Sequence, residues 1–170
     1  DGARTFLSPE AEKLIRSYDF SIMNYETATE YKNARERRKR FVFRASPEAP
    51  RSFAAFSCFS AANNHTFDLF AEGWEATKKA FEDAGTGYVG PYPSESGFVP
   101  FEFKTEKATI RVVSGTIWGG RFGSWSMLDP AGMKKETEKA RKSSSSGDVV
   151  IAYIHGDAEY EKKTKRQEKI

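Results

Sequence analysis

Residues 57–89 read SCFSAANNHTFDLFAEGWEATKKAFEDAGTGYV, and this stretch decides the fold. It begins with a short apolar run at residues 57–60, which predicts a buried strand ending before the polar sequence Asn63-Asn64-His65. A helix is then predicted by four residues that recur at helical spacing: Trp74, Thr77, Phe81 and Ala84. Gly85 is placed as its C-terminal cap, and residues 87–89 predict the next strand. A strand, a helix and a second strand in succession are the unit of a parallel α/β sheet.

The same alternation extends in both directions from this unit. Further strands are predicted at residues 19–23, 41–43, 98–104, 109–114 and 148–154, and helices are predicted to begin at Ser8, Ser46 and Pro130. The run VVIAYI at residues 149–154 is continuously apolar, which is typical of a strand in a sheet covered on both faces. Residues 119–123 contain three glycines and are predicted to form a flexible loop. We therefore predict one α/β domain over residues 1–170 with a mainly parallel sheet.

The composition excludes several classes of protein. With 170 residues, 38% of them hydrophobic, the chain is long enough to bury a sizeable core. Its single cysteine excludes a small scaffold held together by internal disulfides. No apolar run approaches the roughly 18 residues needed to cross a bilayer, so membrane association is expected only through segments outside this chain.

The net charge of +3 is small, but the basic residues are concentrated. Residues 30–44 contain seven lysines and arginines against two glutamates. We interpret this stretch as a solvated loop in which Arg37, Arg38 and Lys39 are exposed, because unpaired charges are costly to bury. No RNA-recognition, zinc-finger or helix-turn-helix signature accompanies the charge, so no nucleic acid partner is expected.

Polar residues follow three of the predicted strands. Glu26 comes shortly after the first strand, Asn63-Asn64-His65 follows the strand at residues 57–60, and His155 follows the last strand. The chain contains only two histidines, and both lie at strand ends. Since ligands bind outside the carboxyl ends of parallel strands, we predict that Glu26, Asn64 and His155 converge at one edge of the sheet.

A carboxylate, an amide oxygen and an imidazole around one point suit a divalent metal ion of the Mn, Fe or Zn type. A further histidine beside such a site is suited to protonating a leaving group. The residues alone leave a second interpretation open, in which His65 and His155 are ordinary hydrogen-bonding residues and Asn63-Asn64 is a turn. Asp68 is interpreted as the N-terminal cap of the helix that follows it.

Three collinear segments of the sequence resemble the poly-γ-glutamate capsule-biosynthesis (CapA-type) family, whose fold is similar to that of the calcineurin-like metallophosphoesterases. The most specific segment is ANNHTFD at residues 62–68, followed by Glu72-Gly73. The segment NYET at residues 24–27 resembles the family's Asn-Leu-Glu-Thr segment. The last predicted strand, with residues 155–160 after it, resembles a family strand followed by His-Trp-Gly-x-Glu-Tyr.

This resemblance implies an α/β fold of the metallophosphoesterase-like layered-sandwich type with a mainly parallel sheet. It implies a protein of capsule biosynthesis that acts on an anionic polymer or a phosphoester, at the cell envelope or outside the cell. It also implies roles for seven residues: Glu26, Asn64 and His155 as metal ligands, His65 as the catalytic residue beside the leaving group, and Asn63, Glu159 and Tyr160 as substrate contacts.

Two segments of the family's pattern are not found in this sequence: a strand ending in Gly-Asp before Glu26, and a Gly-His-His-Pro-His-like segment near the end. We therefore expect an incomplete domain that binds a divalent metal (Mn, Fe or Zn) weakly or not at all and has little phosphoesterase activity. The alternative function is a non-catalytic module of the same fold that holds an acidic polymer or glycan. Its binding surface would combine the basic stretch with four aromatic residues: Tyr92, Trp118, Phe122 and Trp125.

Overall fold

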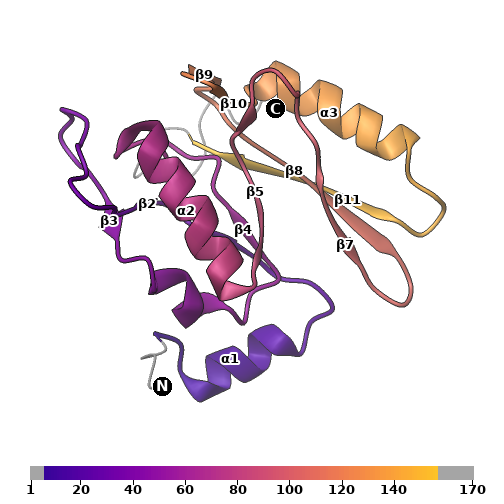
Figure 1. Cartoon of the computed structure of the whole chain (residues 1–170). Helices are drawn as coiled ribbons and strands as arrows, with labels where there is room; N and C mark the ends of the chain where they lie inside the picture. The colour runs from indigo at the N-terminus through magenta and orange to yellow at the C-terminus, as the bar shows by residue number, and fades with distance from the viewer. Residues whose placement is uncertain (1–5, 157–170) are drawn as a thin grey trace.

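The computed structural model describes residues 6–156, whose helices and strands are arranged as in Figure 1. The helices of this part are α1 (Pro9–Arg16), the 3-10 helix η1 (Ala49–Phe53), α2 (Phe70–Ala84) and α3 (Pro130–Lys142). Its strands are β1 (Ile22–Asn24), β2 (Ala28–Thr29), β3 (Arg44–Ala45), β4 (Cys58–Ser60), β5 (Gly87–Val89), β6 (Tyr92–Pro93), β7 (Phe101–Lys104), β8 (Thr109–Thr116), β9 (Gly120–Phe122), β10 (Trp125–Met127) and β11 (Val149–His155).

Two three-stranded sheets pack against each other at the centre of the fold. The first has the strand order β1-β4-β5 and is parallel throughout, and in the second, β11-β8-β7, strand β8 is parallel to β11 and antiparallel to β7. Buried Cys58 and Val89 of the first sheet meet Ile110 and Val112 of the second in one apolar cluster. The predicted α/β fold with mainly parallel sheets is confirmed, but the expectation of one sheet is wrong, because the described strands also form the smaller sheets β6-β10-β9 and β2-β3 beside these two.

Helix α2 packs on the β1-β4-β5 sheet and buries the face predicted from its sequence (Figure 1). Trp74 and Phe81 are both 0% exposed, which confirms their expected burial. The Phe81 ring lies 5.0 Å from that of Phe59 in β4, and Trp74 meets Trp125 edge-on at 5.9 Å. Gly85 caps the helix in the left-handed conformation, with φ of 68°, as its position predicts.

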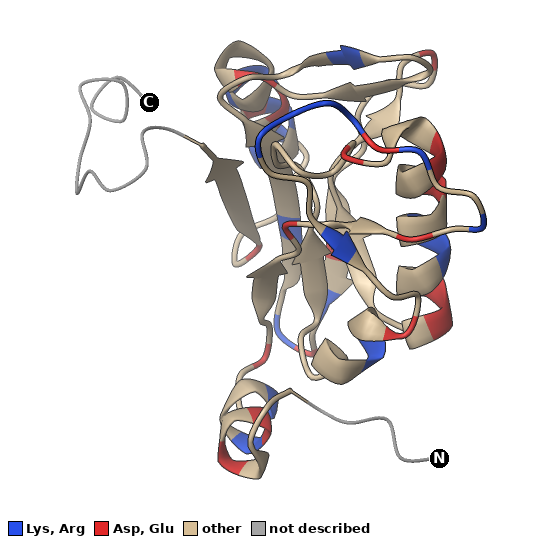
Figure 2. Ribbon diagram, turned by 90° about the vertical axis from the view of Figure 1, so that its left-hand side faces the viewer, with Lys and Arg blue, Asp and Glu red and all other residues tan. Residues whose placement is uncertain are grey.

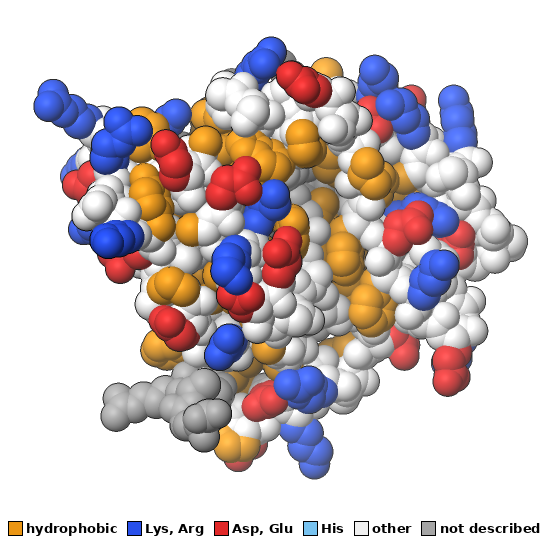
Figure 3. All heavy atoms as spheres, viewed as in Figure 1, with side chains coloured by type: hydrophobic (Ala, Val, Ile, Leu, Met, Phe, Trp, Pro, Cys, Tyr) orange, Lys and Arg blue, Asp and Glu red, His pale blue; other side chains and the backbone are white. Residues whose placement is uncertain are grey.

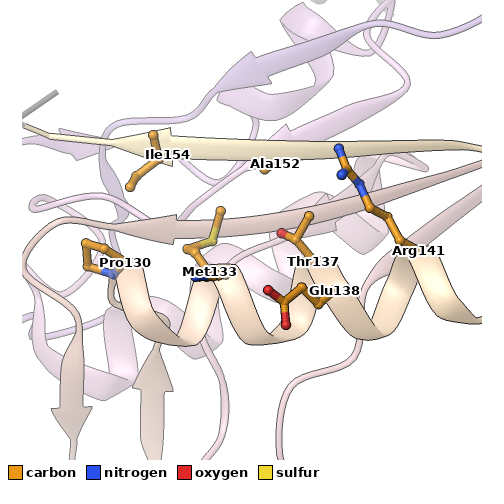
Figure 4. A pocket seen from close by; sticks show the side chains of 8 residues that line it. Pro130, Met133, Thr137, Glu138, Arg141, Ala152 and Ile154 are labelled. Carbon is orange, nitrogen blue, oxygen red and sulfur yellow. The ribbon is translucent and has the colours of Figure 1, made fainter. Parts of the chain in front are cut away.

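Helix α3 packs on the second sheet, beside β11. Asp129 caps the helix by accepting the Gly132 N–H at 2.7 Å, and Met133 is buried against Val113 of β8. Between α3 and β11 lies a pocket of about 380 Å³, into which Met133 and Thr137 project from the helix (Figure 4). In the described residues β11 is an edge strand, but both of its faces are covered, as predicted: Ile151 and Tyr153 pack in the cluster between the two sheets, and Val150 and Ile154 pack in the cluster that contains Met133 of α3.

Two local predictions are also wrong. A strand was predicted at residues 41–43, but the strand of this region is β3, which begins after them at Arg44 and pairs in parallel with β2. The glycine-rich residues 119–123 contain strand β9, which is antiparallel to β10. Gly120 and Gly123 have φ values of 113° and 66°, so the glycines supply the tight backbone turns of this hairpin rather than a flexible loop.

The surface carries both signs of charge in an interspersed pattern, with hydrophobic side chains gathered in a band right of centre in Figure 3. This pattern agrees with the small net charge of +3. Within residues 6–156 no helix is both long and apolar enough to cross a membrane.

Candidate functional site

The candidate site lies where strands of both central sheets end. Asn24 is the last residue of β1, the segment with Asn64 and His65 follows β4, and His155 is the last residue of β11. Parallel strands point their carboxyl ends the same way, and the packing of the two sheets brings these ends together. The predicted residues are therefore adjacent, although they converge between two sheets and not at the edge of one.

Glu26, Asn64 and His155 are in mutual reach, as the sequence predicts. His155 Nε2 lies 2.8 Å from Asn64 Oδ1 and 3.7 Å from Glu26 Oε1. The Asn24 amide contacts two of these residues. Its Nδ2 donates to Glu26 Oε2 at 2.9 Å and lies 3.3 Å from His155 Nδ1. The site thus gathers a carboxylate, an amide oxygen and an imidazole, which was the predicted combination.

The hydrogen bonds of His155 define one neutral tautomer of its ring. Asn64 Oδ1 can only accept, so the proton lies on His155 Nε2, and His155 Nδ1 accepts from the Asn24 amide. Burial lowers the pKa of His155 below its ordinary value, the nearby Glu26 opposes this, and His65 lowers it further. The arrangement therefore favours an uncharged His155.

His65 and Asp68 form a buried pair that the sequence analysis missed. His65 Nδ1 lies 2.7 Å from Asp68 Oδ2, and the two side chains are 8% and 1% exposed. A carboxylate can only accept, so Nδ1 carries the proton and Nε2 faces the site, 3.9 Å from Glu26 Oε1. The Phe43 ring stacks on the imidazole at 3.8 Å and holds its plane.

Asp68 is not a helix cap, and this prediction is wrong. Helix α2 begins at Phe70, its N-cap position is Leu69, and no side chain caps it. The Asp68 carboxylate turns instead toward the loop before β3, where it accepts the Phe43 N–H at 2.7 Å and pairs with the Lys39 ammonium. The sequence carries no signal for this pair, because a carboxylate that orients a histidine is recognised by its geometry and not by its position in the sequence.

Lys39 is a second residue that the sequence analysis did not assign to the site. Arg37, Arg38 and Lys39 are exposed residues, as predicted. The Lys39 ammonium nevertheless reaches the site, where it donates to the Asn64 carbonyl at 3.0 Å and lies 3.3 Å from His65 Nδ1. The basic loop is therefore anchored to the site through one lysine.

Asn63 lines the neighbouring pocket but is only 1% exposed. Its amide nitrogen donates to Tyr25 O at 2.9 Å and to Asn24 Oδ1 at 3.2 Å, and its oxygen accepts the His65 N–H at 3.1 Å. These bonds tie the end of β1 to the turn that carries His65, so the geometry favours a positioning role over the expected substrate contact. Glu159 and Tyr160, the other expected substrate contacts, lie outside the described residues.

A pocket of about 160 Å³ adjoins Asn64. Its polar wall contains Arg37 and Lys39, and its apolar wall contains Trp118 and Phe122. Trp118 is 52% exposed and its ring lies 6.1 Å from that of His155, whereas Trp125, expected on the same surface, is buried in the core. The pocket combines positive charge with an exposed aromatic ring beside the two histidines.

The donor chemistry of Glu26, Asn64 and His155 fits a single divalent transition metal ion, since it offers one carboxylate oxygen, one amide oxygen and one imidazole nitrogen. Within residues 6–156 no group of three or more His, Cys, Asp and Glu side chains is arranged to hold a metal ion. Glu26 and His155 provide two ligands of the proposed site, and the third is the amide oxygen of Asn64. The described residues thus offer ligands for one ion, with the proton on His155 Nε2 in competition with it.

Comparison with known families identifies one match for almost the whole chain. The sequence model described as bacterial capsule synthesis protein PGA_cap matches residues 4–170. The match includes every site residue discussed above. A search among curated proteins finds no similar sequence.

Proposed function

This chain belongs to the bacterial capsule synthesis protein family, and on that premise we propose that its site is a metallophosphoesterase-like hydrolytic centre acting on an anionic polymer or a phosphoester. The same membership assigns the chain to capsule synthesis, and we infer that it works at the cell envelope or outside the cell. The hydrolytic step and the substrate are the proposed part, and the following observations support them.

The observation that carries the proposal is the His65–Asp68 pair, with 2.7 Å between Nδ1 and Oδ2. A buried carboxylate that accepts from one ring nitrogen orients the other nitrogen for proton transfer. His65 Nε2 is directed toward Glu26, beside Asn64 and His155. As an imidazolium that carries a second proton on Nε2, a histidine held in this way donates that proton to a leaving-group oxygen, which typically contributes a factor of about 100 to 10,000 in rate.

Glu26, Asn64 and His155 are the residues that would hold a divalent ion. Such an ion, when bound, supplies Lewis-acid polarisation of the scissile group. Asn24 orients two of these ligands, because its amide donates to Glu26 and to His155. Lys39 and Arg37 supply positive charge on the side from which an anionic substrate would enter the 160 Å³ pocket.

Weak metal binding is the expected behaviour of this ligand set. Within residues 6–156 the three protein ligands leave the remaining coordination positions to water, and His155 Nε2 must lose its proton before it can bind an ion. We therefore expect low affinity and slow turnover, since an incomplete set of ligands does not hold the reacting groups in place.

Manganese titration tests the proposal. The chain contains two histidines, and Mn²⁺ bound at the site should broaden the NMR signals of both imidazoles at millimolar concentrations. His155→Ala should weaken Mn²⁺ binding through loss of a ligand, whereas His65→Ala should leave the affinity unchanged. Single-turnover hydrolysis of an alkyl phosphodiester such as glycerophosphoglycerol at high Mn²⁺, whose alkoxide leaving group needs a proton, should be slow in the unmodified chain and about 100-fold or more slower in His65→Ala.

The alternative function, a non-catalytic module that holds an acidic polymer, is favoured by one observation. His155 Nε2 and Asn64 Oδ1 form a hydrogen bond of 2.8 Å with each other, so these two polar atoms have a partner without a metal ion. Equal hydrolysis rates with and without His65, together with polyanion binding that needs no Mn²⁺, would establish this alternative and refute the hydrolytic proposal.

A further inference from the structure

We propose that Arg35, Arg37 and Arg121 form, with the rings of Phe70 and Phe122, a second anion subsite that binds an extended polyanionic chain. One anionic group of that chain would occupy this subsite while another lies beside Lys39 and Asn64. The inference rests on the proposed function, since it assumes that the chain held here reaches the site of His65.

Two pockets meet along one wall of the molecule. The pocket of about 160 Å³ beside Asn64 and a pocket of about 320 Å³ beside Arg121 share three lining residues, Arg37, Phe67 and Phe122. In Figure 2 the longest run of lysines and arginines (blue) belongs to the loop that carries Arg37, and this loop lies at the end of the molecule toward which β11 points. A ligand longer than one anionic group can therefore contact both pockets.

Two of the three arginines of the second pocket lie over aromatic rings. The Arg37 guanidinium carbon lies 5.7 Å from the ring centre of Phe70 and 5.5 Å from that of Phe122. Arg35 also lies over Phe70, with 5.6 Å between its guanidinium carbon and the ring centre. Stacking limits the motion of a guanidinium and leaves its N–H groups free to form paired hydrogen bonds with an oxyanion.

Packing and backbone conformation position the rings of Phe122 and Phe70. Phe67 is 4% exposed and stacks on Phe122 with 4.5 Å between ring centres. Phe70 has a φ of 61°, a left-handed conformation that is costly for a bulky residue. The fold therefore maintains a strained backbone at the residue whose ring lies under both Arg35 and Arg37.

The protein neutralises the positive charge of this pocket only in part. In the described part of the chain no carboxylate forms an ion pair with Arg37 or Arg121, and the Nε of Arg121 donates to the Gly123 carbonyl. Arg35 has one partner, Glu72 at 3.6 Å, and both side chains are more than half exposed. An exposed pair of this kind is worth little and exchanges readily with a ligand.

This chemistry selects oxyanions that repeat along a chain. Guanidinium groups bind carboxylates and phosphates through two parallel hydrogen bonds, so both kinds of anion share the same recognition. A single small anion would use one pocket only. Two adjoining pockets, each with basic residues and an aromatic wall, favour a polycarboxylate or a polyphosphate.

Binding of two defined polyanions tests the subsite. The affinities for tripolyphosphate and for an oligoglutamate peptide are measured by calorimetry at low ionic strength, where charge interactions are least screened. The double variant Arg37→Gln/Arg121→Gln removes two guanidiniums, and Arg38→Gln, a change in the same loop that lines neither pocket, is the matched control. Circular dichroism and thermal unfolding verify that each variant is folded, and the single variant Arg121→Gln repeats the test at an exposed position.

We expect the double variant to lose at least about tenfold in affinity for one or both polyanions, since it removes the charge-assisted hydrogen bonds of two guanidinium groups. The polyanion that shows the loss identifies the anionic group. Unchanged affinity for both, an equal loss in Arg38→Gln, or no binding of either polyanion by the unmodified chain would overturn the subsite. Inorganic phosphate alone, followed by the His65 signal, tests the hydrolytic site separately, so either proposal can fail while the other stands.

Discussion

Replacing Asp68 by asparagine tests the assignment of His65 most directly, because Asp68 is the group that sets its tautomer. The carboxylate accepts from the Phe43 N–H and from His65 Nδ1, each at 2.7 Å, and it pairs with the Lys39 ammonium. An asparagine of the same shape has one acceptor oxygen and one amide group. Whichever way it turns, it places a donor against at least one of these three donors.

The structure sets the size of the effect. A hydrogen bond to a charged group contributes about 1.5–3 kcal/mol, and breaking a fully buried ion pair costs about 3–5 kcal/mol. The Lys39 side chain is 29% exposed, so it can recover part of the loss by turning into water. We therefore expect Asp68→Asn to lower the free energy of unfolding by about 2–3 kcal/mol.

Denaturant unfolding measures this change, and long-range proton–nitrogen NMR spectra measure the tautomer. The chain has only two histidines, and His155→Ala leaves one imidazole and so assigns the signals. His65 should carry its proton on Nδ1 in the unmodified protein and shift toward Nε2 in Asp68→Asn. The control is Asp83→Asn on the surface of α2, whose pair with Lys79 at 2.9 Å is exposed and should be worth less than about 1 kcal/mol. An unchanged tautomer with a loss of stability no larger than that of the control would refute the reasoning.

Three further predictions concern the fold. Trp74→Ala should lower the free energy of unfolding by about 3–5 kcal/mol in denaturant titrations, since it empties a fully buried position, and a loss below 1 kcal/mol would contradict the packing of α2. Gly115→Ala should cost about 1–3 kcal/mol by the same measurement, because its Cβ would lie 2.6 Å from the Leu128 carbonyl oxygen, and an unaltered midpoint would show that the backbone can yield there. Hydrogen bonding by Arg111 lowers the pKa of Asp148 to about 2, so its contribution to stability is present above the ordinary carboxyl pKa near 4 and is lost as the pH falls toward 2. Asp148→Asn should therefore destabilise the protein at pH 7 and less so at pH 2, and an equal difference at both values would exclude this linkage.

Local patterns of the sequence were sufficient for the main elements and for the residues of the site. The apolar face of α2, its cap at Gly85 and the strands at residues 58–60 and 149–155 depend on spacings of a few residues, which can be read along the chain. Glu26, Asn64 and His155 were placed together because each follows a strand, and parallel strands end on the same side.

The pairing of the strands was beyond the sequence, because it depends on contacts between residues far apart in the chain. Strand β11 pairs with β8 and not with β1 or β4, so the site lies between two sheets. The same limit applies to Asp68, whose spacing from the helix suits a cap. Only the approach of the loop with Lys39 and Phe43 gives its carboxylate stronger partners than the helix N–H groups.

The sequence by itself determined the main elements, the α/β class and the residues that gather at the strand ends, because these follow from short-range periodicity and from the direction of parallel strands. The tertiary structure alone decided what those residues do to one another. The proton positions on His65 and His155 follow from partners that lie 3 residues away in one case and 91 in the other. The arginines of residues 35–37 acquire their orientation only when the rings of α2 and β9 are packed beneath them. Hydrogen bonding and stacking require distances of a few ångströms, and only the folded chain brings such groups that close.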